Sequence, residues 1–146
     1  MDESEHDDTV TGFFFCVFAA PTAESPPVNA VYLRGAADAH FLEGLFGPLY
    51  EREGIGLSCS DDEIIPPKKL SALAAAVRSV VVQVERQPET WPVQLGHRFI
   101  PFSKELGKPI YGAASRQRLL EFLHGVLSQI DLAEQHGHSL YWGGGT

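Results

Sequence analysis

The chain has 146 residues, of which 44% are hydrophobic and 10% aromatic, and its formal net charge is −8. This composition argues against disorder of the whole chain and fits one domain with its own hydrophobic core. It lacks the clustered Lys and Arg that bind phosphate backbones and any apolar run near the roughly 20 residues that span a bilayer, so we expect neither nucleic acid nor membrane as a partner.

The two ends of the chain predict the domain boundaries. Five acidic residues lie in the first eight positions, so we expect residues 1–8 to form an acidic disordered tail. This start is the reverse of the positively charged region of a secretory signal, and the expected location is therefore cytoplasmic. A single α+β domain is expected over residues 9–142, followed by a frayed C-terminus over residues 143–146.

The first part of the domain predicts strands around one short helix. The apolar run over residues 9–20 is typical of a central strand covered on both faces, and residues 28–33 follow as a second strand. Asp38 can cap a short helix over residues 38–50, which is weakened by two glycines and a proline. A further short strand is expected over residues 55–60.

Two longer stretches have the helical period. The first covers residues 67–86, with Pro67 in its first turn, although the β-branched residues within 80–84 leave a strand open as the alternative. The second covers residues 115–136, with Ser115 as N-cap and Gly137 just beyond its end. The predicted fold is therefore α+β, a mostly antiparallel sheet with these two helices packed on one face and the short helix nearby.

The rest of the chain predicts short strands and one long connection. Residues 91–95 and 139–142 are expected to be strands, whereas residues 96–114 contain five prolines and glycines and keep no sustained period. A long connection of this kind is either functional or held in place by its aromatic side chains.

No motif predicts a catalytic residue, a metal site or a cofactor. Residues 56–60 begin like the nucleophile elbow G-x-S-x-G, but Ser60 stands where the second glycine belongs. His136 and His138 could contribute to a zinc site, yet a structural site needs four ligands and a catalytic site three. Cys16 and Cys59 form no CxxC pair and are expected to be buried free thiols, with a disulfide between them left open.

Aromatic residues of the irregular segments and of the C-terminal end supply most of the candidate binding residues. Aromatic anchors of this kind are favoured at protein interfaces and ligand pockets, although they also hold loops against a core. Together with two neighbouring polar residues, the candidates are Trp91, His97, Arg98, Phe102, Tyr111, Tyr141 and Trp142.

These observations predict a non-enzymatic protein-binding module, with a protein partner or a second copy of the chain as its ligand. In size and charge the chain resembles the small acidic immunity proteins of bacteria, which neutralise basic toxins. The alternative is a small metal- or ligand-binding enzyme that uses the region of His97, His136 and His138. A third hypothesis is a structural subunit that associates through the uncharged second side of the helix over residues 70–84.

Overall fold

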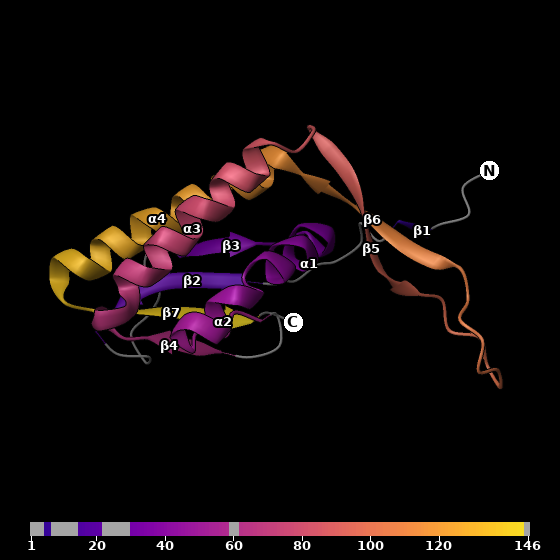
Figure 1. The fold of residues 1–146 in the computed structure, drawn as a ribbon, viewed down its shortest axis with the longest axis horizontal. Helices are drawn as coiled ribbons and strands as arrows, with labels where there is room; N and C mark the ends of the chain where they lie inside the picture. The colour runs from indigo at the N-terminus through magenta and orange to yellow at the C-terminus, as the bar shows by residue number, and fades with distance from the viewer. Residues whose placement is uncertain (1–4, 7–14, 22–29, 59–61, 145–146) are drawn as a thin grey trace.

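The computed structural model describes residues 5–6, 15–21, 30–58 and 62–144 and has the predicted α+β fold. Within these residues the strands form two sheets, where the sequence analysis expected one. The larger sheet has the strand order β3-β2-β7-β4 and carries the core, and the smaller sheet has the order β1-β6-β5. Figure 1 shows the smaller sheet extending away from the helices and the larger sheet.

The larger sheet is antiparallel and brings the two ends of the domain together. β2 (Phe15–Ala20) pairs with both β3 (Val31–Leu33) and β7 (Ser139–Gly144), and β7 pairs in turn with β4 (Glu63–Ile65). The predicted first strand is therefore present from residue 15, and residues 9–14 lie outside the described residues. β7 continues two residues beyond its predicted end, because residues 143 and 144 pair with residues 16 and 15.

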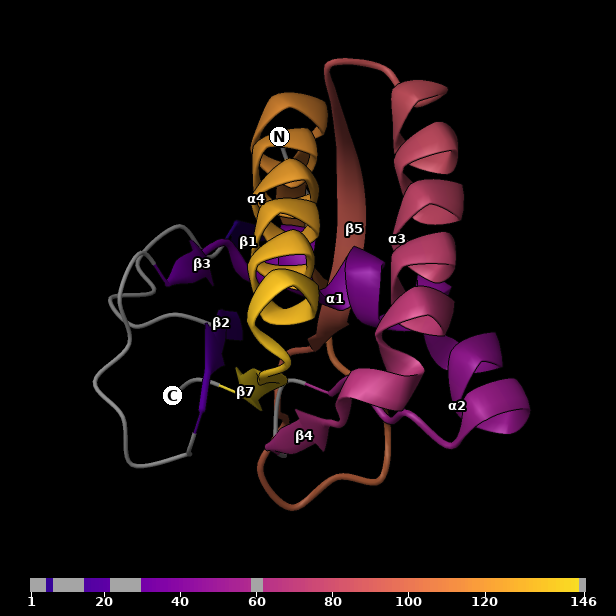
Figure 2. The ribbon, with the colours of Figure 1, turned by 90° about the vertical axis from the view of Figure 1, so that its left-hand side faces the viewer.

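Both long amphipathic helices are confirmed. α3 (Leu70–Glu85) follows a 3₁₀ turn at Pro67–Lys69, and α4 (Arg116–His136) lies beside it (Figure 2). The predicted caps of α4 are also present: the Arg118 N–H donates to Ser115 Oγ at 3.3 Å, and Gly137 adopts the left-handed conformation with φ 66°. Among the helices in the described part of the chain, none has the length and apolar character needed to span a bilayer.

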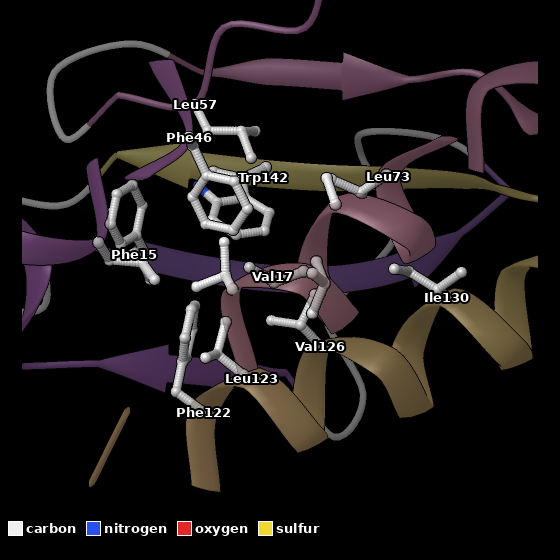
Figure 3. Close-up of a cluster of buried hydrophobic side chains, with 14 of the residues drawn as sticks. Phe15, Val17, Phe46, Leu57, Leu73, Phe122, Leu123, Val126, Ile130 and Trp142 are labelled. Carbon is white, nitrogen blue, oxygen red and sulfur yellow. The ribbon is translucent and has the colours of Figure 1, made fainter. Parts of the chain in front are cut away.

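The core lies between the larger sheet and these two helices. The apolar stripes around Val77 on α3 and Val126 on α4 belong to one buried cluster. Trp142 is its largest fully buried side chain, and its indole makes edge-to-face contacts with Phe15, Phe46 and a third phenyl ring from α4 (Figure 3). Such aromatic contacts add stabilisation beyond the burial of apolar area.

The short helix predicted over residues 38–50 is two helices. α1 (Ala36–Leu45) and α2 (Gly47–Glu53) meet at Phe46, because Pro48 lacks the N–H that a continuous helix would need there and is accepted in the first turn of α2. Asp38 is not the cap, since the N-cap position of α1 is Gly35. The strand predicted over residues 55–60 is not formed in its described part, where Ile55 and Leu57 are buried in an irregular segment.

The long connection predicted over residues 96–114 is instead part of a hairpin. β5 (Thr90–His97) pairs antiparallel with β6 (Pro109–Ser115), with a bulge between Gln94 and Gly96. On its other side β6 pairs in parallel with β1 (Glu5–His6), and the rest of the predicted N-terminal tail lies outside the described residues. β5 is an edge strand of this sheet and carries the exposed Pro92.

Candidate functional site

The β5–β6 hairpin is the part of the described chain that projects furthest from the core. Figure 1 shows its two strands leaving the ends of α3 and α4 and crossing past α1, with the loop between them pointing away from the body. The exposed side chains of that loop are therefore accessible to another molecule.

The base of the hairpin is fixed by Asp38, the one buried charged side chain of the described core. Its carboxylate accepts the Ser115 N–H at 2.7 Å and the Arg118 Nε–H at 2.8 Å. These bonds join the first turn of α1 to the point where β6 becomes α4. A charge-assisted hydrogen bond is about twice as strong as a neutral one, so this junction holds the hairpin in a defined direction.

Close packing of α1 on the stem of the hairpin gives a second support. A Cβ atom at Gly112 would lie only 2.9 Å from the Cβ of Ala37, so β6 needs glycine where α1 crosses it. Beside this point the Trp91 ring meets the Phe41 ring edge to face, with 4.9 Å between the centroids. Trp91 is therefore a stem residue that holds α1 against the hairpin.

The stem closes at a backbone pair beyond the two strands. The Arg98 N–H donates to the Lys108 carbonyl at 2.8 Å. The neighbouring Gly107 lies so close to the Arg98 carbonyl that no side chain would fit between them. We define the hairpin tip as residues 98–108, which comprise this closing pair and the loop beyond it.

The tip is built around a tight turn at Pro101 and Phe102. The Ser103 N–H donates to the Ile100 carbonyl at 3.3 Å and closes the turn. Pro101 presets the first central position, and Phe102 occupies the second with φ 61°. Glycine or asparagine normally takes this left-handed position, and a bulky residue there costs on the order of 1–3 kcal/mol. Phe102 is the one non-glycine residue with positive φ among the described residues.

Large apolar side chains are exposed on the tip. Phe102 is fully exposed, Phe99 is 81% exposed and Leu106 is 73% exposed. The sequence leaves two alternatives open for the aromatics of this segment, a binding role or an anchoring role against the core, and Phe99 and Phe102 are not anchored against the core. Single exposed apolar residues are ordinary, but three on one projecting loop form a candidate contact surface.

The charge of the tip is opposite to that of the whole chain. Arg98, Lys104 and Lys108 are exposed there, against the single acidic residue Glu105. The tip is therefore basic and apolar, whereas the chain has a net charge of −8. Any partner with an acidic, apolar recess is complementary to it.

The hairpin brings together five of the seven candidate binding residues. Trp91 and Tyr111 lie in its stem, where both are partly buried, and His97, Arg98 and Phe102 follow toward the loop. The exposed His97 lies with its Nε2 3.2 Å from the side-chain nitrogen of Gln94.

The other two candidates belong to the larger sheet. Trp142 is a core residue with no exposed surface, so it cannot contact a partner in this conformation. Tyr141 stacks on Phe18 of the neighbouring strand, with 5.2 Å between the ring centroids. Neither side chain lies near the hairpin tip.

The histidines of the alternative hypothesis are not brought together. The His136 and His138 rings stack at 5.4 Å at the C-terminal end of α4, and His97 lies at the far end of β5. α4 alone is about 30 Å long and begins at the base of the hairpin, so its full length separates the two places. Within the described ranges no group of three His, Cys, Asp or Glu side chains could hold a metal ion.

Cys16 is a buried free thiol, as predicted, and Cys59 lies outside the described residues. Burial raises the pKa of the Cys16 thiol above its usual value, and a hydrogen bond with Tyr32 opposes that rise only in part. The thiolate is therefore scarce at neutral pH, which is typical of a structural rather than a reactive cysteine.

Sequence reasoning missed Phe99, Leu106 and Lys104 as surface residues of the candidate site. One signal for them was available: basic residues alternate with large apolar residues over residues 98–108 of an otherwise acidic chain. Comparison of the chain with protein-family models, curated proteins and solved structures found no match in any of the three.

Proposed function

We propose that this chain is a non-enzymatic protein-binding module that contacts its partner through the hairpin tip. The observation that carries the proposal is the full exposure of Phe102 in a left-handed conformation at the end of a supported stem. An aromatic side chain on a backbone that is already fixed by a turn loses less conformational entropy on binding than one on a flexible loop.

The strain at Phe102 supports the same function. Backbone strain of this kind persists where the surrounding structure imposes it, and it is concentrated at functional positions. Nothing within the fold gains from the strain, because the Phe102 ring is not buried by any described residue.

A protein-binding module that resembles the acidic immunity proteins would bind a basic toxin through an acidic surface. The exposed apolar side chains of the tip instead lie among basic residues. The tip therefore favours an acidic partner. The absence of a nucleic-acid partner remains part of the proposal, supported by the net charge of −8, and so does a cytoplasmic location, which the net charge does not test.

Site-specific photo-crosslinking in cells that naturally produce the chain tests this function. A photoreactive phenylalanine analogue is placed at position 102 in one variant and at position 82 in another. Val82 is the matched control, because it is also an exposed apolar residue but lies on α3, away from the hairpin tip. We expect crosslinked protein of discrete mass from position 102 and none from position 82.

A second pair of variants checks that the crosslink reports binding. Phe99→Ser combined with Leu106→Ser should remove at least about nine-tenths of the crosslinked product formed at position 102, whereas Val82→Ser should leave it unchanged. The proposal is wrong if position 102 yields no protein crosslink, or if both positions yield the same products.

A further inference from the structure

We infer that the partner of the hairpin tip is a second copy of this chain, whose acidic pocket beside α2 receives the tip. This inference rests on the proposed function of the tip as a protein-binding surface. It adds the identity of the partner and the site on the partner that binds the tip.

The pocket lies where α1 and α2 meet the irregular segment before β4. Its volume of about 370 Å³ is within the range of roughly 300–1,000 Å³ that is usual for binding pockets. Tyr50 contributes aromatic surface to it, since its side chain is 64% exposed, and the buried Phe46 lies at its base. The Tyr50 ring also lies 3.4 Å from the place where a Cβ at Gly56 would be, so the small residue leaves room beneath the ring.

The walls of the pocket are acidic. Glu43 comes from α1 and Glu63 from β4, and both side chains line the pocket. None of the described lining residues is basic, and Lys69 Nζ, which lies 3.7 Å from where a Cβ at the lining Gly54 would be, donates to the Glu53 carbonyl. An aromatic or aliphatic side chain with a neighbouring cation is therefore the ligand that this pocket fits best.

The hairpin tip is a ligand of this kind. Phe102 supplies a fully exposed aromatic ring, and Lys104 and Lys108 supply positive charge on the same loop. The rest of the chain is acidic, so two copies repel each other except where a basic tip is part of the contact. Charge thus favours a tip-to-body contact between copies, and the pocket with its exposed Tyr50 ring is the place on the body that also fits an aromatic side chain.

Geometry requires the contact to be between copies. Figure 1 shows the tip extending away from α2, so the tip of one copy does not reach its own pocket. Reciprocal exchange, in which each tip enters the pocket of the other copy, gives a closed two-fold dimer. Two small contacts with charged rims produce association that is weak and sensitive to salt.

Sedimentation velocity of the full chain tests the inference at protein concentrations from about 1 µM to 1 mM in low salt. One variant reverses the charge of the tip by Lys104→Glu and Lys108→Glu. A second variant reverses the charge of the pocket by Glu43→Lys and Glu63→Lys. Thermal unfolding of each variant is measured first, so that a loss of association is interpreted only for folded protein. If the double variant of the pocket is unfolded, the single variant Glu63→Lys replaces it.

We expect the unaltered chain to dimerise and each reversed variant to associate at least about tenfold more weakly, because like charges then face each other. An equimolar mixture of the two variants should recover the dimer. In the mixture the acidic tip of one variant meets the basic pocket of the other, and the remaining tip and pocket keep their natural charges. Val82→Ser, on a different surface, should leave the dimer unchanged.

Three outcomes overturn the inference: an unaltered chain that stays monomeric at about 1 mM, reversed variants that dimerise as well as the unaltered chain, or a mixture that fails to recover the dimer. A monomeric chain whose position 102 still crosslinks to another protein in cells overturns only the inference and leaves the proposed function intact. A monomeric chain without any crosslink contradicts both.

Discussion

Single residues at the base of the hairpin have roles that their sequence context does not reveal. Asp38 has the residue type of an N-cap and stands near a helix start, so the sequence predicts a cap. In the fold its carboxylate instead bonds Ser115 and Arg118, which are almost eighty positions away. A long-range partner of this kind leaves no periodic pattern, so sequence reasoning could not assign it.

We predict that Asp38→Ala lowers the free energy of unfolding by about 2 kcal/mol, because it leaves a Ser115 N–H without its acceptor and removes the ion pair with Arg118. Urea unfolding followed by circular dichroism measures the change. Asp131→Ala, at an exposed acidic position of α4, is the control and should change stability by less than about 0.5 kcal/mol. Equal effects of the two substitutions would show that the Asp38 network does not stabilise the fold.

Gln129 is a second residue whose role depends on a distant partner. It lies within the buried stripe of α4, where the helical period predicts an apolar residue. Its side-chain oxygen accepts the Ala19 N–H of β2 at 2.9 Å, which satisfies a backbone donor of the sheet beneath the helix. The period correctly placed the face of the helix, but it could not indicate which position on that face would be polar.

At the scale of elements, predictability follows the strength of the local pattern. α3 and α4 were predicted with nearly correct bounds, because apolar residues repeat at steps of three and four over several turns. β6 was missed, because Pro109 and Gly112 interrupt its strand pattern. The fold explains why β6 tolerates both residues. Pro109 is the first residue of the strand, and Gly112 leaves the space that Ala37 of α1 needs. Elements whose residues are chosen for contact with a neighbouring element are thus the ones that a local sequence pattern does not predict.

Two glycines in this region should respond to substitution in opposite directions. Gly112→Ala should lower the free energy of unfolding by about 1–3 kcal/mol, because its Cβ would lie 2.9 Å from the Cβ of Ala37. Gly44→Ala should raise it by about 0.5–1 kcal/mol, because Gly44 lies on the exposed side of α1 with open space around it. Urea unfolding of both variants checks the pair. A gain at position 112 would mean that α1 does not pack on β6 as described.

At the scale of the whole molecule, the core and the candidate site are separate. The core lies between the larger sheet and the helices α3 and α4, whereas the tip adds exposed side chains at the end of the hairpin. The general α+β class could be predicted from the sequence, since it follows from helices and strands with clear periods. The projecting tip could not, because its direction depends on Asp38 and on the packing of α1.

This separation predicts that the tip can be removed without loss of the fold. Replacing residues 99–107 by an Asn-Gly turn joins the paired Arg98 and Lys108 directly and suits a two-residue hairpin connection. Thermal unfolding should change by no more than about 2 °C, because the replaced side chains are not part of the core. The same variant should no longer dimerise in sedimentation velocity. A large fall in the unfolding temperature would show that the tip supports the fold.

Pro92 has a further consequence for a molecule that presents such a tip. A long strand at the edge of a sheet offers free N–H and C=O groups that recruit strands of other molecules into fibrous aggregates. Pro92 stands in the middle of that edge on β5 and has no N–H to donate, so the row of available donors is interrupted. At high concentration the chain can therefore present a loop that binds another protein, while Pro92 opposes the pairing of β5 with strands of further molecules.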